Sequence, residues 1–159
     1  MRYAIQWVRS FVFFVQMYVV LLIVGVGFLP WALIDRRGGY ACVHFYCGWV
    51  RWTASWMVGL KTEVRGTPPQ NEVIVAGKHQ SFLDVLMISS VIPRPKFIMK
   101  DSLRWTPVLG WYGAILACVP VKRGRRAEAI RKMMEDLEKG NSVRGQLCIY
   151  PQGTRVAPG

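Results

Sequence analysis

Residues 11–34 form an almost uninterrupted apolar run in which Gln16 is the one strongly polar side chain. A helix needs about 20 apolar residues to cross the hydrocarbon core of a bilayer, so this run is long enough. It is too long for a signal peptide, and no small-x-small cleavage site follows it. Arginines flank the run on both sides, so charge does not decide its orientation. We predict a membrane helix here. The alternative is a buried helix of a soluble protein.

A second apolar segment, residues 40–60, follows a predicted turn at Gly38-Gly39. Three tryptophans spaced i, i+3 and i+7 share one helical face: Trp49, Trp52 and Trp56. Tryptophan and basic residues are typical of helices that lie at the membrane interface. A second spanning helix is the alternative, but Arg51 in mid-segment would make it costly. We therefore predict that residues 1–60 form a two-helix membrane anchor.

The composition favours a membrane surface over nucleic acid as the anionic partner. The chain has 159 residues, enough for one modest domain, with a formal net charge of +12 and a positive mean hydropathy. Positive charge attracts anionic lipids, nucleic acids or phosphorylated substrates. A nucleic-acid binder has no use for a long apolar segment. We therefore expect the lipids of an anionic bilayer, and no nucleic acid, among the partners.

The cysteines and histidines form no metal-binding pattern. Four cysteines occur without a Cys-x-x-Cys pair: Cys42, Cys47, Cys118 and Cys148. We interpret them as buried thiols in a reducing compartment rather than as disulfides. No zinc site can be assembled from this spacing. His44, within the second apolar segment, is interpreted as an interface residue rather than a ligand.

From residue 61 the sequence has the alternating pattern of an α/β domain. The predicted strands cover residues 61–66, 72–76, 96–99, 116–121 and 146–150. The predicted helices cover residues 81–92, 105–115 and 125–139. Strands that alternate with helices favour a largely parallel central sheet. The chain is thus divided into an anchoring segment, residues 1–60, and an αβ domain, residues 61–159.

His79 and Asp84 stand at the junction between a predicted strand and the following helix. The strand ends at Ala76, so a histidine leaving it and an aspartate one helical turn later can face each other. A general base near pH 7 needs an imidazole and a carboxylate that fixes its tautomer and stabilises the imidazolium. We predict that this pair has those roles. The simpler interpretation is a hydrogen-bonded histidine at a helix start and a solvated first-turn aspartate.

Basic residues follow three further predicted strands. Lys100, Arg123 and Arg155 each come soon after a strand ends. Ligands of open α/β sheets bind outside the carboxyl ends of the strands, so these residues would share a rim with His79. Arginine binds phosphate through two parallel hydrogen bonds, which suits a phosphorylated substrate with a hydroxyl to deprotonate. The alternatives are solvated charges and, for residues 122–126, a basic patch on anionic lipid.

Three motifs carry a resemblance to a known family. They are His79-x-x-x-x-Asp84, Val119-Pro120-Val121-Lys122-Arg123 and Tyr150-Pro151-Gln152-Gly153-Thr154-Arg155. In this order, behind a hydrophobic anchor, they resemble the first three motifs of the 1-acylglycerol-3-phosphate acyltransferases, also called lysophosphatidic acid acyltransferases. The resemblance covers nearly the whole chain. It implies a glycerolipid-acyltransferase-like αβ domain behind the two-helix anchor.

The resemblance also implies an O-acyltransferase activity. His79 would act as general base on the sn-2 hydroxyl of 1-acylglycerol-3-phosphate, and Asp84 would orient it. The acyl group would pass directly from coenzyme A or acyl carrier protein, giving phosphatidic acid for phospholipid biosynthesis. The substrate phosphate would be held by Lys100, Arg123, Gly153, Thr154 and Arg155. No metal or bound cofactor is implied. The location expected is a membrane, taken as the inner membrane of a bacterium with the catalytic domain facing the cytoplasm.

The chain departs from the family pattern at three points. Gln152 stands where the third motif usually has glutamate, so a negative charge is lost. Lys122 precedes Arg123 where an acidic residue is frequent. The sequence stops at Gly159, before the family's fourth, proline-containing apolar motif. We therefore expect the C-terminal part of the domain to be missing.

Two other functions stay open at this point. In the first, the chain is an acyltransferase whose acceptor is another lysolipid, such as a lyso-ornithine lipid, or glycerol 3-phosphate. Alternatively, the chain would be a non-catalytic basic module that docks acyl carrier protein or anionic lipid at the membrane surface. Lipid binding that does not depend on His79 would favour the module.

Overall fold

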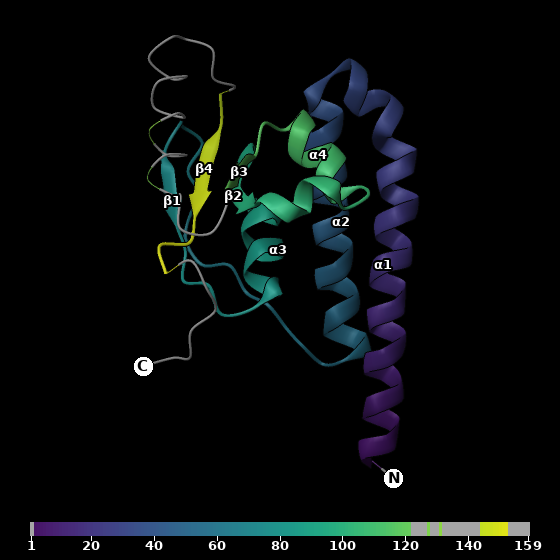
Figure 1. Ribbon diagram of the computed structural model, residues 1–159. Helices are drawn as coiled ribbons and strands as arrows, with labels where there is room; N and C mark the ends of the chain where they lie inside the picture. The colour runs from purple at the N-terminus through teal and green to yellow at the C-terminus, as the bar shows by residue number, and fades with distance from the viewer. Residues whose placement is uncertain (1, 122–126, 128–130, 132–143, 153–159) are drawn as a thin grey trace.

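The computed structural model describes residues 2–121, 127, 131 and 144–152. Two long antiparallel helices stand beside a small α/β domain (Figure 1). The helices are α1 (Arg2–Ile34), α2 (Arg36–Met57), α3 (Phe82–Val91) and α4 (Leu109–Ile115), with a 3₁₀-helix η1 (Asp101–Trp105). The strands are β1 (Ile74–Ala76), β2 (Pro95–Lys100), β3 (Val119–Val121) and β4 (Gln146–Ile149).

The strands form one sheet in the order β1-β4-β2-β3, and every pairing is parallel. The predicted parallel sheet is therefore confirmed. The last strand of the described chain lies inside the sheet, between β1 and β2. All strands end at the same edge, which Figure 1 shows at the lower side of the sheet. Side chains that follow the strands consequently meet at that edge.

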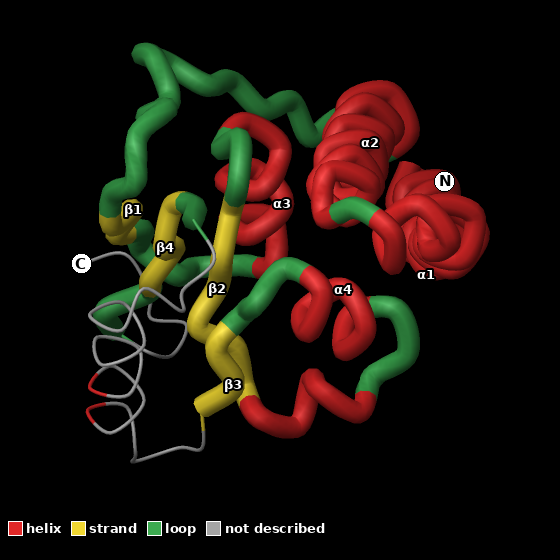
Figure 2. Tube along the Cα trace, turned by 90° about the horizontal axis from the view of Figure 1, so that it is seen from above, coloured by secondary structure: helices red, strands yellow, loops and turns green. Residues whose placement is uncertain are grey.

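Helices α1 to α4 are layered on one face of the sheet. Viewed along the long helices, α3 and α4 lie between the sheet and α2, and α1 is outermost (Figure 2). Two clusters of buried side chains hold these layers together. The first joins α1, α2 and α3 through Met17, Tyr46, Cys47, Val50 and Leu86. The second joins α1, α2 and the α4 region through Ala32, Cys42, Val108 and Tyr112.

Helix α1 has one packed face and one exposed apolar face. Within the described part of the chain, it is the helix long and apolar enough to cross a membrane, over Tyr3–Ile34. Only 17% of its most apolar window is buried, which argues against the core helix of a soluble protein. Large apolar side chains are exposed along its whole length, from Tyr3 and Trp7 to Leu33 and Ile34. The polar Gln16 is on the packed face, where it accepts a 3.0 Å hydrogen bond from Trp49 Nε1.

Helix α2 differs from the prediction, because the two-helix anchor is not confirmed. It is not a candidate span, and both of its flanks are covered, by α1 on one side and by α3 on the other. Arg51 does not face lipid: its guanidinium donates to Thr62 Oγ1 at 2.9 Å and to Ser90 Oγ at 2.7 Å. The exposed part of α2 is narrow and aromatic, and includes Trp52 and Trp56. Only that stripe is exposed in the way the predicted interfacial helix requires, and its contact with the membrane stays a prediction.

The predicted turn at Gly38-Gly39 is wrong, because both glycines lie inside α2. The turn is one residue long and consists of Asp35, whose carboxylate accepts the backbone N–H of Arg37 at 2.8 Å and caps the helix. A Cβ at Gly38 would lie 2.8 Å from the backbone nitrogen of Ala32. The glycine is needed for this close approach of α2 to the end of α1, rather than for a turn.

Other predicted elements differ in detail. Residues 61–66, all of them described, form no strand. The predicted helix 105–115 begins only at Leu109, after η1 and a turn at Pro107. The predicted strand 116–121 is shortened to its last three residues. The predicted helix 125–139 lies almost wholly outside the described residues.

Candidate active site

The segment between β1 and α3 places His79 beside the start of a helix. Gly77 still follows the sheet, since its N–H donates to the Ile149 carbonyl at 3.0 Å. The chain then leaves the sheet at its carboxyl edge, and Ser81 caps α3. The side chain of Ser81 accepts the N–H of Leu83 at 3.1 Å. Capping fixes the entry angle of the helix and hence the position of the residues around it.

Asp84 completes this capping box from the third position of α3. Its Oδ2 accepts the backbone N–H of Gln80 at 2.6 Å and of Ser81 at 2.7 Å. Burial alone would raise the pKa of the Asp84 carboxyl. The hydrogen bonds from Ser81 and Gln80, together with the nearby imidazole of His79, more than offset this, so its pKa is lowered. At neutral pH the Asp84 side chain is therefore a negatively charged carboxylate, fixed in position by backbone N–H groups.

The same carboxylate faces the imidazole of His79. Asp84 Oδ2 lies 3.3 Å from His79 Nδ1, and both side chains are mostly buried, at 21% and 23% exposed. The approach is out of line for a hydrogen bond, and Nδ1 has no aligned partner among the described residues. A carboxylate at this place favours the tautomer with the proton on Nδ1. The Nε2 lone pair is then left to accept a proton from a substrate.

Tyr150, the residue after β4, packs against His79. Its ring centroid lies 4.4 Å from that of His79, with an angle of 33° between the planes. The ring also stacks on Phe97 of β2 at 6.4 Å. Burial, followed by the charge of Asp84, raises the pKa of the Tyr150 hydroxyl. That hydroxyl is buried without a hydrogen-bond partner among the described residues.

The sequence motif that contains Tyr150 predicts no role for this residue, and its place beside His79 is evident only in the structure. Nothing local reveals it, because β1 and β4 are separated by about 70 residues and pair only in the folded sheet. Gln152 was noted only as a departure from glutamate. In the structure its Oε1 accepts the backbone N–H of His79 at 3.4 Å. A neutral amide can therefore still hold the loop that carries the base.

The predicted phosphate ligands are only partly within the described structure. Lys100 ends β2 at the edge where His79 follows β1, and its side chain is exposed. Strands lie about 4.8 Å apart, so with β4 between them β1 and β2 are separated by about 10 Å. A phosphorylated glycerol can bridge such a distance. The remaining predicted ligands lie outside the described residues: Arg123, Gly153, Thr154 and Arg155.

The second histidine is far from this site. His44 Nε2 lies 2.9 Å from the carbonyl oxygen of Ile92, at the other edge of the sheet. Within the described ranges, no group of three or more histidine, cysteine or acidic residues is placed to hold a metal ion. The side chains that the structure brings together at the carboxyl edge of the sheet are the imidazole of His79 and the carboxylate of Asp84.

Comparison with known proteins identifies the fold and family. The profile of the acyltransferase family matches residues 61–159, more than half of the chain. The chain belongs to the acyltransferase family. The segment that carries His79 and Asp84 lies within the matched region, and so does the whole described sheet.

Two relatives with similar sequences share one enzyme name. The chain is 32% identical over 102 residues to the 1-acyl-sn-glycerol-3-phosphate acyltransferase of Saccharomyces cerevisiae, covering 62% of this chain and 34% of the relative. It is 31% identical over 104 residues to the human alpha enzyme of the same name, covering 63% and 37%. The chain thus spans about a third of the length of these relatives.

A solved structure is similar over almost the entire chain. The crystal structure of the 1-acyl-sn-glycerophosphate acyltransferase PlsC from Thermotoga maritima matches with a TM-score of 0.73 at 25% identity. The match covers 98% of this chain and 64% of that one. Since it includes α1 and α2, the arrangement of the long helices beside the α/β domain is shared with that acyltransferase.

Proposed function

We propose that this protein transfers a fatty acyl group from an acyl thioester to the sn-2 hydroxyl of 1-acylglycerol-3-phosphate, giving phosphatidic acid. The observation that carries the proposal is the 3.3 Å approach of Asp84 to His79 at the carboxyl edge of a parallel sheet. Relatives named as 1-acyl-sn-glycerol-3-phosphate acyltransferases support the acceptor. The donor is acyl-CoA or acyl carrier protein, without a bound cofactor or metal.

The geometry supports direct transfer with His79 as the base. The proton of the sn-2 hydroxyl moves to His79 Nε2 as the oxygen forms a bond to the acyl carbonyl carbon. The carbon–sulfur bond then breaks, and the leaving thiolate takes the proton back from the imidazolium. Asp84 stabilises the imidazolium while it exists. Base catalysis of this kind contributes typically 10²–10⁴-fold.

The substrate phosphate needs cations near the base, and Lys100 is the described candidate. Its ammonium group, at the end of β2, is on the same edge as His79. We propose that Arg123, Gly153, Thr154 and Arg155, which follow β3 and β4 in the sequence, complete the phosphate site. Replacing Lys100 with glutamine should raise KM for the phosphorylated acceptor more than it lowers kcat.

We propose that the protein lies in one leaflet of a membrane, with its catalytic domain on the cytoplasmic side of a bacterial inner membrane. Helix α1 is outermost and exposes its apolar face away from the sheet (Figure 2). Its other face is joined to α2 and α4, so a perpendicular orientation would draw the packed domain into the bilayer. The four free cysteines fit a reducing compartment.

The test is thiol release by the full chain in mixed micelles with lysophosphatidic acid. Wild type should release thiol from acyl-CoA or acyl carrier protein, and the comparison of the two identifies the donor. His79→Ala should lower turnover by about 10²–10⁴-fold. His44→Asn changes the chain's other histidine and serves as the control with near wild-type turnover. Wild-type turnover in His79→Ala would refute the mechanism.

A second acceptor is favoured by one specific relative. The chain is 29% identical over 99 residues to the lyso-ornithine lipid O-acyltransferase of Rhodobacter capsulatus. A lyso-ornithine acceptor has no phosphate, so its turnover should be indifferent to Lys100→Gln. If the chain acylated the lyso-ornithine lipid faster than lysophosphatidic acid in the same assay, the lyso-ornithine lipid would be its acceptor. If no acceptor gives His79-dependent release while lipid still binds, the non-catalytic module is the better description.

A further inference from the structure

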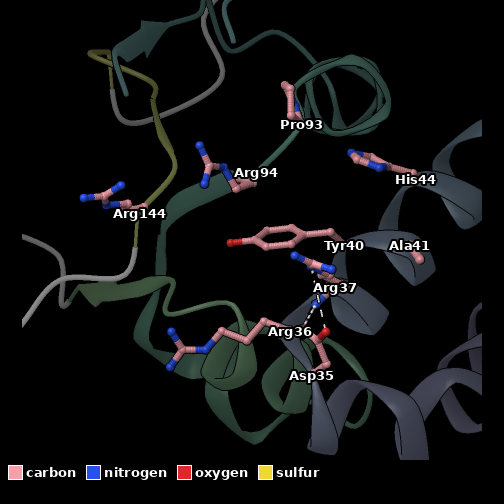
Figure 3. A pocket seen from close by; sticks show the side chains of 9 residues that line it. All are labelled: Asp35, Arg36, Arg37, Tyr40, Ala41, His44, Pro93, Arg94 and Arg144. Atoms are coloured by element: carbon pink, nitrogen blue, oxygen red, sulfur yellow. Dashed lines mark hydrogen bonds and ion pairs between the residues drawn. The ribbon is translucent and has the colours of Figure 1, made fainter. Parts of the chain in front are cut away.

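A basic pocket lies at the end of the domain opposite the candidate active site. It has a volume of about 510 Å³ and is bounded by the start of α2 with the turn before it, the residues just before β2, and Arg144, which lies two positions before β4. Four arginines from these three segments line it: Arg36, Arg37, Arg94 and Arg144. Figure 3 shows Arg94 and Arg144 on one side and Arg36 and Arg37 on the other. Segments distant in sequence thus bring four positive charges around one space.

The charges in this pocket are not balanced. Asp35 is the one carboxylate in its lining, and it lies 3.9 Å from Arg37 in an exposed pair. Arg144 lies 3.6 Å from Glu72 in another exposed pair. Pairs of this kind contribute little energy and are easily exchanged for a better anion. Arg36 and Arg94 have no carboxylate partner in the part of the chain that the structure describes.

The position of Arg94 is fixed by a buried amide. The side chain of Gln146 is completely buried, and its Oε1 accepts the Arg94 backbone N–H at 2.9 Å. Its Nε2 donates to the carbonyls of Gln70 and Asn71 at 3.1 and 2.9 Å. The backbone at this end of the sheet is therefore held in place, which fixes the point from which the Arg94 side chain extends.

Tyr40 lines the pocket, and its hydroxyl is covered by neighbouring atoms. Its ring projects from α2 between the arginines, with the hydroxyl pointing toward the side of Arg94 (Figure 3). This hydroxyl is buried and has no hydrogen-bond partner among the described residues. Burial raises its pKa, while the charges of Arg36 and Arg94 oppose the shift, so the hydroxyl is a neutral donor. A buried donor without a partner costs free energy that an acceptor in the pocket would recover.

We propose that this pocket binds the phosphate headgroup of an anionic glycerophospholipid of the membrane. Guanidinium groups and a hydroxyl donor match phosphate oxygens in charge and hydrogen-bond geometry. The choice of a lipid over a free anion rests on what precedes the pocket. Trp31, Leu33 and Ile34 are exposed, and they end the apolar face of α1 immediately before Asp35. A lipid whose acyl chains enter the membrane beside these side chains would have its headgroup near the pocket.

This lipid is not the molecule that is acylated. Arg94 precedes β2 and Lys100 ends it, and a strand of six residues is about 20 Å long. The reacting hydroxyl of lysophosphatidic acid is only a few bonds from its phosphate. A phosphate in the basic pocket therefore cannot present its hydroxyl to His79. The pocket is a second lipid site, and it does not depend on the proposed transfer reaction.

The experiment uses the full chain in micelles of a non-ionic detergent. Calorimetric titrations with dihexanoyl phosphatidylglycerol, dihexanoyl phosphatidylcholine and sodium phosphate separate an anionic headgroup, a zwitterionic headgroup and a free anion. Phosphatidylglycerol is neither the proposed substrate nor its product, so its binding reports on the pocket. We expect saturable binding of phosphatidylglycerol that is at least about tenfold tighter than binding of the other two.

Variants assign the binding to the pocket. The double change Arg36→Gln and Arg94→Gln should weaken phosphatidylglycerol binding by about tenfold or more, and Tyr40→Phe by about threefold. The control, Lys61→Gln with Arg65→Gln, removes the same charge from the exposed segment after α2. It should leave binding unchanged, and both double variants should keep wild-type thiol release.

Three outcomes would overturn the proposal. In the first, the pocket variant binds phosphatidylglycerol as tightly as wild type does. In the second, the two double variants lose affinity equally, which would mean attraction by net charge alone. In the third, sodium phosphate binds as tightly as the lipid, which would make the pocket a free-anion site. None of these outcomes bears on whether His79 catalyses transfer, so the two proposals fail separately.

Discussion

The carboxylate of Asp84 lies 3.3 Å from His79 Nδ1 and at the same time closes the capping box of α3 with Ser81. One oxygen atom, Oδ2, takes part in both arrangements. The start of the helix and the orientation of the base are therefore coupled. Stability and catalysis can be separated only by substitutions that remove one of these roles and leave the other.

Asp84→Asn and Ser81→Ala make that separation. Asparagine is a good acceptor at helix N-termini but has no negative charge for the imidazolium, so kcat should fall about 10²-fold or more with little change in stability. Ser81→Ala removes the capping hydroxyl and should cost about 1 kcal/mol of unfolding free energy. Its kcat should fall much less than that of Asp84→Asn. Thermal unfolding measures the loss of stability and thiol release measures the loss of kcat, and both are determined for each variant.

An equal loss of kcat in the two variants would show that Asp84 acts only through the helix cap. Gln80 offers a useful comparison, because its backbone N–H donates to Asp84 while its side chain is not part of the box. Gln80→Ala should therefore behave as wild type in both measurements.

Acid should remove the stabilisation that Asp84 provides. Its folded-state pKa is lowered by the hydrogen bonds it accepts, despite the opposing effect of burial. A lowered folded pKa means that the contribution is fully present above the ordinary aspartate value of about 3.9 and is lost as the pH falls through the folded pKa. The difference in Tm between wild type and Asp84→Ala, which loses the capping acceptor, should be constant from about pH 7 to 5 and shrink below about pH 4. A difference that grows toward low pH would contradict this assignment.

The nearness of His79 and Asp84 could be predicted because it is local. The two residues are five positions apart, and the strand and helix that flank them are evident in the sequence. The parallel sheet was also predictable from the alternation of elements. The motif residues after β3 and β4 were predicted as phosphate ligands, and this stays a prediction, since they lie outside the described residues.

The parts that the sequence did not reveal depend on contacts between distant segments. Arg51 appeared to be a basic residue of an interfacial helix, but its partners Thr62 and Ser90 place it inside the folded domain. Tyr150 reaches His79 only because β4 inserts beside β1. Periodicity describes which face of a segment is apolar, whereas the partner of that face is decided by the whole chain.

Tyr150 should position the base through its ring and not through its hydroxyl. Tyr150→Phe keeps the ring contact and removes a buried hydroxyl without a partner, so kcat and stability should stay near wild type. Tyr150→Leu removes the flat surface against His79 and should lower kcat by about tenfold or more, because small shifts of a catalytic group are costly. Steady-state kinetics and the pH profile of kcat distinguish them. A large loss in Tyr150→Phe would mean that the hydroxyl itself contacts the substrate.

The exposed face of α1 should be the surface that enters the membrane. Val19 and Ile23 are 49% and 64% exposed on that face. Changing both to aspartate should weaken binding to phosphatidylcholine vesicles by at least about tenfold, because a carboxylate is costly in an apolar phase. The Tm in detergent should change little, since surface substitutions away from the core usually cost within about 0.5 kcal/mol.

The control for this face places the same charges elsewhere. Val64 and Val73 are exposed valines in the segment between α2 and β1, and changing both to aspartate should leave vesicle binding near wild type. Vesicle flotation measures the binding of both double variants at one salt concentration. Both variants carry the same added negative charge, so a difference between them reports on its position. If the α1 variant floated like wild type, the apolar face of α1 would not be the membrane surface, and the exposed tryptophans of α2 would be the next segment to test.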